Sequence, residues 1–221
     1  PILTANTPDQ IRFGSVGRPL FNVDIMIAED GEILAKGPNV MEGYFNNDAA
    51  TSEAIDSDGW FHTGDIGHLD DDGYLFITDR KKNILVTSAG KNVAPAPIEN
   101  SMLSSTYIEQ VVVIGDKRNF ISALIAPNEE AVFNELKNRG IDVSRDEVFS
   151  NNKDVKNLIF EEVSKAMNNF SNYEQVKEFS IIPSLLTLEK GELTPTLKVV
   201  RKVVLDNYSH LVDKIYSGES N

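Results

Sequence analysis

The apolar positions in the first third of the chain favour short β-strands joined by tight turns. Over residues 23–27 apolar and polar side chains alternate, and the turn at 29–32 (Glu-Asp-Gly-Glu) separates them from a second apolar stretch. Such alternation is typical of a strand with one buried face, and glycine-containing polar tetrapeptides are typical turns. Strands are predicted over 23–27, 33–36, 66–69 and 74–77, with a short helix over 48–54. Several short strands with close turns indicate a small β-barrel-like or sandwich subdomain.

Beyond residue 84 the pattern changes to a mixture of helices and buried strands. Prolines open a helix near residue 96, Gly140 closes another, and an apolar stripe runs along residues 198–216. Helices are predicted over 96–103, 129–138, 146–149, 155–170 and 198–216, and strands over 110–114, 121–126 and 176–182. The predicted fold class is therefore α+β, with a β-rich part followed by a mixed α/β domain in which helices flank a short sheet.

A polar, charged segment (Asp-Arg-Lys-Lys-Asn, residues 79–83) separates these two parts, and we interpret it as a linker or hinge. The predicted organisation is a β-rich subdomain over 1–79, a hinge over 80–83 and a second domain over 84–221. A chain of 221 residues is long enough for two small domains.

Charge and residue usage narrow the classes of function. The net charge of −13 disfavours a nucleic-acid partner, which needs a basic face, but leaves room for small anions at local positive groups. The absence of cysteine excludes disulfides and thiolate chemistry and is compatible with the cytoplasm, and the three histidines show no metal-ligand spacing. No apolar run approaches the roughly 20 residues of a membrane span, and no signal peptide is visible. The chain opens on Pro1 rather than Met, so we expect it to be a piece of a longer protein.

Two charged residues in the first half are candidates for binding a nucleotide. Asp65, at the end of a Thr-Gly-Asp turn, could accept hydrogen bonds from a ribose diol, although the Thr-Gly-Asp tripeptide alone favours an aspartate that caps the turn. Arg80 offers a planar fork for ribose or phosphate oxygens, or it could be a surface residue paired with Asp79.

Two further candidates lie in the second half. Gly90 permits a left-handed turn and close approach of a ligand to the backbone, although a plain hairpin explains the same residues. Lys198 follows a Thr-Pro-Thr segment that is a good approach to a helix start. It could be presented to another domain from the edge of that helix, or it could be an ordinary surface lysine of the first turn.

Two other motifs do not support a binding site. The segment 70–73 (Asp-Asp-Asp-Gly) resembles the start of a calcium loop, but Tyr74 and Phe76 occupy the next alternate ligand positions, so we interpret it as a hairpin turn. The Walker pattern for binding nucleotide phosphates is absent throughout. Because segment 70–73 does not fit a calcium loop and the histidines lack metal-ligand spacing, we predict no metal site.

Four ordered segments together resemble the adenylate-forming acyl-CoA synthetase superfamily, and within it the bacterial long-chain fatty acid–CoA ligases. They are GEILAKGPNVMEGYF (31–45), DGWFHTGD (58–65), DRKKNILVTSAGKNVAPAPIE (79–99) and ELTPTLKVVR (192–201). The resemblance covers nearly the whole chain. It departs from many relatives at three positions: Leu197 and Asp79 stand where glycine is usual, and Asn83 stands where an acid is common.

The resemblance implies a two-step reaction. A fatty acid carboxylate attacks the α-phosphate of ATP to give acyl-AMP and pyrophosphate, and the thiol of coenzyme A then attacks acyl-AMP. By the same resemblance Asp65 and Arg80 hold the ribose hydroxyls, Lys82 is the hinge, and Gly90 lines the passage for coenzyme A. Lys198 is the catalytic lysine of adenylation. The second domain would be a mobile C-terminal lid.

The family's phosphate loop, adenine-binding segment and fatty-acid tunnel lie upstream of the residues present here. We therefore expect a C-terminal portion that is inactive alone, with the N-terminal adenylation domain as its partner and with Mg²⁺ bound by residues outside this chain. The expected location is cytoplasmic, with peripheral membrane contact compatible with a lipid substrate. Two rival hypotheses remain: an acyl-AMP ligase that drops coenzyme A, and a stand-alone, non-catalytic binding module derived from a ligase tail.

Overall fold

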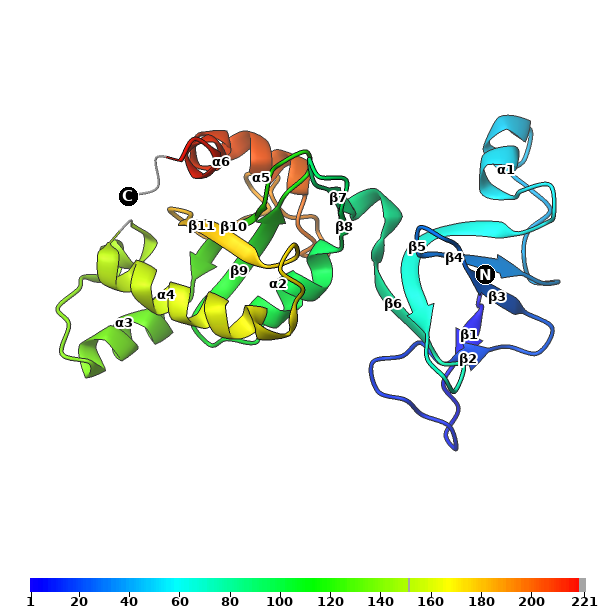
Figure 1. The fold of residues 1–221 in the computed structure, drawn as a ribbon, viewed down its shortest axis with the longest axis horizontal. Coiled ribbons are helices and arrows are strands. Elements are labelled where there is room, and N and C mark those ends of the chain that lie inside the picture. Colours follow the sequence, from blue (N-terminus) through cyan, green and yellow to red (C-terminus); the bar gives the residue numbers. More distant parts are fainter. Residues whose placement is uncertain (151, 219–221) are drawn as a thin grey trace. The chain divides into compact units, whose positions relative to one another are not determined.

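The computed structural model describes residues 1–150 and 152–218, and the chain forms two compact units, Pro1–Ile84 and Leu85–Asn221. The second domain was predicted to extend to residue 221, and residues 151 and 219–221 of it lie outside the described part. Each unit has its own sheet (Figure 1).

The first unit is built on a four-stranded antiparallel sheet in the order β3-β4-β5-β6. The strands of this unit are β1 (Thr4–Ala5), β2 (Arg18–Pro19), β3 (Asp24–Ile27), β4 (Glu32–Lys36), β5 (Phe61–Leu69) and β6 (Leu75–Arg80), and its helix is α1 (Asp48–Ala54). β1 and β2 form a separate two-stranded ribbon. Ile33, Leu34, Ala35 and Leu75 are buried, so β4 is covered on both faces rather than alternating.

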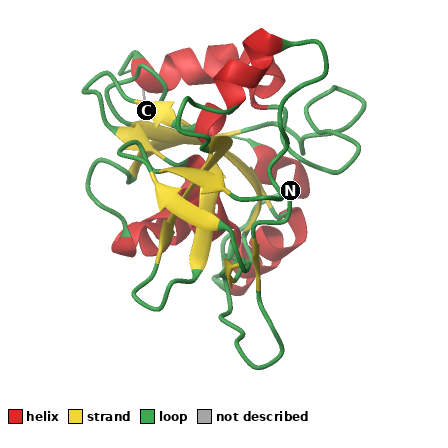
Figure 2. Cartoon of the chain, turned by 90° about the vertical axis from the view of Figure 1, so that its right-hand side faces the viewer, coloured by secondary structure: helices red, strands yellow, loops and turns green. Residues whose placement is uncertain are grey.

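The second unit is a three-stranded sheet covered by helices on both faces (Figures 1 and 2). Its strands are β7 (Leu85–Val86), β8 (Asn92–Val93), β9 (Ile108–Ile114), β10 (Ile121–Pro127) and β11 (Val176–Ile181). Its helices are α2 (Pro95–Leu103), α3 (Glu129–Asn138), α4 (Lys153–Ala166), α5 (Arg201–Asn207) and α6 (Ser209–Tyr216), with 3₁₀ turns at Arg145–Phe149 and Met167–Asn169. The sheet order is β11-β10-β9, with β10 antiparallel to β9 and parallel to β11.

Alternation along β9 and β10 creates two apolar cores in the second unit. Val111 and Val113 pack with α2, α3 and α4, whereas Val112 and Ile114 face the opposite way and pack with α5 and α6. Because successive side chains of a strand point to opposite faces, one sheet can support helices on both sides. The predicted α+β class, with a curled β-rich part and a short sheet flanked by helices, is confirmed.

The predicted helix over 198–216 is wrong at its start and is interrupted. Residues 193 and 199 pair as an isolated β-bridge, and helix α5 begins only at Arg201. Tyr208 then takes a non-helical backbone conformation that separates α5 from α6. The apolar stripe marked buried residues correctly at Val204, Val212 and Ile215, whereas Val199 is exposed. Hydrogen bonding in the loop before Arg201 replaces the first turn of the predicted helix.

Candidate functional site

Asp65 and Arg80 come together as direct partners across neighbouring strands. Asp65 on β5 is in register with Arg80 on β6, and the Arg80 Nε lies 2.7 Å from the Asp65 Oδ1. The Asp65 side chain is 23% exposed and that of Arg80 60% exposed. Arg80 therefore pairs with Asp65 across the sheet. A carboxylate acceptor beside a planar guanidinium donor is an arrangement that can bind the adjacent hydroxyls of a ribose.

The backbone before Asp65 is held by two side chains. Gly64 has a φ of +70°, a left-handed conformation that glycine adopts without strain. The Thr63 hydroxyl donates to the Ile33 carbonyl at 2.7 Å and accepts from the Asp65 N–H at 3.1 Å. The Gly64 N–H donates to the Glu32 carboxylate at 3.0 Å. The Thr-Gly-Asp segment is thus tied to β4 at Thr63 and at Gly64.

Glu32 is a buried residue of this site that sequence reasoning missed. It is 3% exposed, and its Oε2 lies 2.8 Å from the Lys81 Nζ and 2.9 Å from the His62 Nδ1. Burial alone raises the pKa of the Glu32 carboxyl, but hydrogen bonds from Lys81, His62 and the Gly64 N–H outweigh it and hold the pKa below its ordinary value. Hydrogen bonds to Asp30 and Glu32 raise the pKa of Lys81. The position of Glu32, directly before the run Ile33-Leu34-Ala35, was the only indication in the sequence that it could be buried.

The segment predicted as a hinge is partly strand. β6 continues through Arg80, and a 3₁₀ turn follows at Lys81–Asn83. The Asp79 carboxylate, 8% exposed, accepts from the Arg80 N–H at 2.7 Å and from the Asn83 amide at 3.1 Å. Asn83 is therefore a hydrogen-bond donor to Asp79. The Lys82 side chain is exposed.

Gly90 lies at the tip of the hairpin that joins β7 to β8. Its φ is +72°, its N–H donates to the Thr87 carbonyl at 2.9 Å, and an added Cβ would meet no atom within 4 Å. The Lys91 N–H donates to the Thr87 hydroxyl at 3.1 Å. The hairpin explains the glycine's backbone, and the open space beside it is compatible with close approach of a ligand.

Lys198 lies on a tight loop rather than at a helix edge. The Thr194 N–H donates to the Lys198 carbonyl at 2.8 Å, and the Lys198 N–H donates to the Thr194 hydroxyl at 3.1 Å. Leu197, directly before it, has a φ of +59°, which is uncommon for a residue with a side chain. The Lys198 side chain is exposed, and within residues 1–150 and 152–218 its ammonium forms no ion pair.

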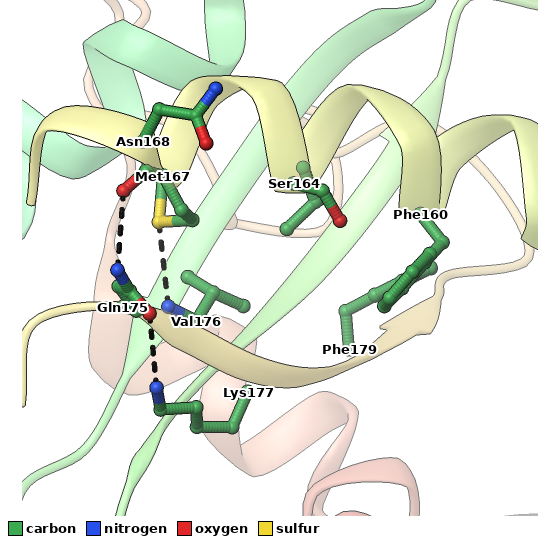
Figure 3. Close-up of a pocket in the computed structure, with 9 residues that line it drawn as sticks. Phe160, Ser164, Met167, Asn168, Gln175, Val176, Lys177 and Phe179 are labelled. Carbon is green, nitrogen blue, oxygen red and sulfur yellow. Dashed lines mark hydrogen bonds between the residues drawn. The ribbon is translucent and has the colours of Figure 1, made fainter. Parts of the chain in front are cut away.

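One cavity of the first unit is lined by the predicted site residue Asp65, whereas a cavity of the second unit is lined by none of the predicted site residues. A cavity of about 230 Å³ is lined by Asp65 and Thr63 together with the apolar residues Ile33, Leu75 and Ile77. Figure 3 shows another, of about 290 Å³, between α4 and β11. Its residues are Phe160, Val163, Ser164, Met167, Asn168, Gln175, Val176, Lys177 and Phe179, none of which is a predicted site residue. The Val176 N–H donates to the Met167 sulfur at 3.4 Å, and the Lys177 ammonium donates to the Gln175 side-chain oxygen at 3.1 Å.

No group of three or more His, Cys, Asp or Glu side chains that could hold a metal ion occurs in the described part of the chain. In the same residues, no helix has both the length and the apolar character needed to cross a membrane.

Comparison with solved structures defines the class of protein. The fold is similar to the adenylation domain of carboxylic acid reductase from Segniliparus rugosus, solved with AMP, with a TM-score of 0.71 and 23% identity, covering 93% of this chain and 33% of that one. It is also similar to the AMP complex of o-succinylbenzoate coenzyme A synthetase from Bacillus subtilis, with a TM-score of 0.59 and 26% identity, covering 86% of this chain and 35% of that one. Both were solved in complex with AMP.

The chain belongs to the AMP-binding enzyme C-terminal domain family, whose model matches residues 82–220. It is 42% identical to long-chain-fatty-acid–CoA ligase FadD15 of Mycobacterium tuberculosis, over 96% of this chain and 35% of the relative. It is 38% identical to human long-chain-fatty-acid–CoA ligase 1, over 88% of this chain and 28% of the relative. The chain thus spans about a third of the length of these relatives, and the predicted resemblance to acyl-CoA synthetases is confirmed.

Proposed function

We propose that this chain is the C-terminal portion of an AMP-forming long-chain fatty acid–CoA ligase. The observation that carries the proposal is the 42% identity to a ligase of that name, which extends over 96% of the chain and therefore through both units. The Asp65–Arg80 pair supports it, because the pair supplies an acceptor and a donor suited to a ribose.

The proposed reaction has two steps. In the first, a carboxylate oxygen of the fatty acid bonds to the α-phosphorus of ATP, the bond to the β-phosphate oxygen breaks, and pyrophosphate leaves. In the second, the sulfur of coenzyme A bonds to the acyl carbon, the bond to AMP breaks, and the thiol proton is lost. Asp65 and Arg80 hold the ribose throughout, and Gly90 lines the passage through which the thiol arrives.

Lys198 acts in the first step. Carboxylate and triphosphate are both anions, so their approach is unfavourable until a cation lies between them. One unit charge at about 4 Å contributes up to ~4 kcal/mol at an effective dielectric constant of about 20. This corresponds to roughly three decades in rate. The exposed ammonium of Lys198, free of ion pairs within the described residues, is available for this role.

The two units would play different parts in the cycle. Residues 1–79 would be the last subdomain of the large adenylation domain, residues 80–83 the hinge, and residues 84–221 a mobile domain that presents Lys198 in one step and Gly90 in the other. The exposed turn with Lys82 after the end of β6 supports a pivot there. A change in a few backbone torsions at such a turn is enough to present two faces of one domain in succession.

The N-terminal adenylation domain of the parent protein is the proposed partner of the first unit. Phe13, Phe21 and Phe45 are more than 90% exposed there, which is unusual for phenylalanine and favours burial against further protein. The fatty acid tunnel and the site for the Mg²⁺ that accompanies ATP would belong to that domain. We expect the whole protein to work in the cytoplasm, which the lack of cysteine allows.

To test this function, the protein expressed from the natural gene is incubated with a long-chain fatty acid, ATP and coenzyme A, and the products are measured. Formation of acyl-CoA, AMP and pyrophosphate supports the proposal, and the 221-residue chain alone should show no turnover. Accumulation of acyl-AMP without acyl-CoA would indicate an acyl-AMP ligase instead. Absence of both products from the natural gene product, with the chain correctly folded, would favour a non-catalytic module.

A further inference from the structure

The loop that carries Lys198 begins at a completely buried glutamate. Glu192 is 0% exposed. Its backbone accepts from the Val200 N–H at 2.8 Å and donates to the Thr187 carbonyl at 3.1 Å, so both ends of the loop meet at this residue.

The Glu192 side chain ties the same loop to two further segments. One carboxylate oxygen accepts from the Thr187 N–H at 3.0 Å, and the other accepts from the side-chain amide of Asn207 at 3.1 Å. Asn207 is the last residue of α5, so the carboxylate joins the start of the loop to the helix that follows it.

A buried carboxylate in this setting is costly. Transfer of a charge out of water is unfavourable unless hydrogen bonds and an opposite charge compensate it. Here the partners are neutral: the Thr187 N–H, the Asn207 side-chain amide and the Tyr208 hydroxyl. Within the described residues no cation lies within ion-pair distance of Glu192. A buried carboxylate without a cationic partner contributes less to stability than an apolar residue of similar size would. Its hydrogen bonds instead fix the positions of the groups that donate to it.

The loop itself contains a strained residue. Leu197 is held at a φ of +59°, and its N–H closes a turn onto the Thr194 carbonyl at 2.8 Å. Sparsely populated backbone conformations persist only where the surroundings determine them, and they gather at functional sites. In this loop the conformation of Leu197 is held by the antiparallel bridge between residues 193 and 199, which directly follows Glu192 in the chain.

We propose that Glu192 is the positioning residue for Lys198. By fixing both ends of the loop from inside the second unit, it holds the lysine in one place on the surface. It touches no reactant itself. This inference rests on the proposed function, in which Lys198 serves adenylation and not thiolysis.

The test is the variant Glu192→Gln in the natural gene product, with both half-reactions measured separately. Glutamine keeps the shape but has only one acceptor oxygen, so either Thr187 or Asn207 loses its partner. Since displacing a reacting group by about 1 Å costs on the order of 100-fold in rate, acyl-AMP formation should slow by roughly 10- to 100-fold. The KM for ATP and the thiolysis of supplied acyl-AMP should stay within about twofold of wild type. Glu189→Gln, at an exposed position three residues earlier, is the matched control and should change neither step.

Two further variants keep the outcomes distinct. Asn207→Ala removes the amide that donates to Glu192, so it should slow acyl-AMP formation and leave thiolysis unchanged. This variant tests the inference if Glu192→Gln does not fold. Lys198→Ala tests the proposed function alone. If Lys198→Ala is selective but Glu192→Gln and Asn207→Ala slow both half-reactions equally, or neither, the inference about Glu192 is wrong while the function stands. If Lys198→Ala itself is not selective, the proposed function fails.

Discussion

Replacing Glu32 by glutamine should destabilise the first unit by an amount that the geometry sets. One oxygen of Glu32 accepts from the Gly64 N–H, and the other accepts from Lys81 and faces the Nδ1 of His62. Glutamine has one oxygen and one NH₂ group. In either orientation of the amide, a donor of the protein therefore faces an NH₂ group.

The cost follows from the burial of that donor. A buried donor left without an acceptor costs about 1–3 kcal/mol. The Lys81 side chain is 48% exposed and can regain water, which lowers the cost on that side. We therefore expect the free energy of unfolding of the first unit to fall by about 2 kcal/mol. At an m-value of about 2 kcal/mol per molar urea, the midpoint should fall by about 1 M.

Trp60 provides the assay, because it is the sole tryptophan of the chain and lies in the first unit directly before β5. Urea unfolding at pH 7 is followed by its fluorescence. The control is Glu29→Gln, at an exposed position three residues earlier, which should change the free energy of unfolding by less than about 0.5 kcal/mol. A Glu32→Gln midpoint equal to that of the control, with an unchanged m-value, would refute the reasoning.

The pH dependence gives an independent check of the same residue. The pKa of Glu32 is held below its ordinary value of 4.5 in the folded state, so as the pH falls below 4.5 the unfolded chain takes up the proton first. The stabilisation by Glu32 is therefore present above pH 4.5 and is lost as the pH falls through the lowered pKa. Glu32→Gln should lack this part of the acid dependence. If the free energy of unfolding falls equally steeply with decreasing pH in wild type and in Glu32→Gln, the acid dependence comes from other carboxylates.

Three other predictions concern the remaining site residues. Asp65→Asn should weaken AMP binding to the natural gene product about tenfold by calorimetry, yet change the free energy of unfolding by less than about 1 kcal/mol because the Arg80 side chain is 60% exposed and water screens the pair; a large loss of stability would make the pair structural. Leu197→Gly should leave stability within about 1 kcal/mol, because relief of backbone strain offsets the entropy of glycine, whereas Leu197→Val should lower it by about 1–2 kcal/mol in thermal unfolding; the reverse order would exclude strain. Gly90→Leu should slow thiolysis and spare acyl-AMP formation, while Gly90→Asn, which tolerates a positive φ, should be milder; equal effects would separate Gly90 from the thiol passage.

The sequence predicted best those elements whose ends carry local chemistry. The helix predicted over 129–138 from the glycine that follows it is confirmed as α3, Glu129–Asn138, and Gly140 has a φ of +75°. The structure adds that the Asn128 side chain caps its start. The interpretation of 70–73 as a turn is confirmed by the Asp70 carboxylate, which accepts from two backbone N–H groups of the hairpin. In both cases the residues that fix the conformation are neighbours in the chain.

Predictions failed where distant residues decide the structure. The helix expected from residue 198 is displaced because Val200 donates to Glu192, eight positions earlier. The strand predicted over 74–77 runs on to Arg80, because Arg80 pairs with Asp65, fifteen positions earlier on β5. Glu32 and Glu192 both follow a glycine and look like turn residues in the sequence, so their burial depends on packing that no local pattern reveals.

The central claim is that Lys198 serves the first half-reaction and not the second, and Lys198→Ala in the natural gene product tests it most directly. Single-turnover formation of acyl-AMP from fatty acid and ATP is compared with thiolysis of supplied acyl-AMP by coenzyme A. The account predicts that acyl-AMP formation falls by roughly three decades and that thiolysis stays within a few-fold of wild type. Loss of both half-reactions by the same factor would contradict it.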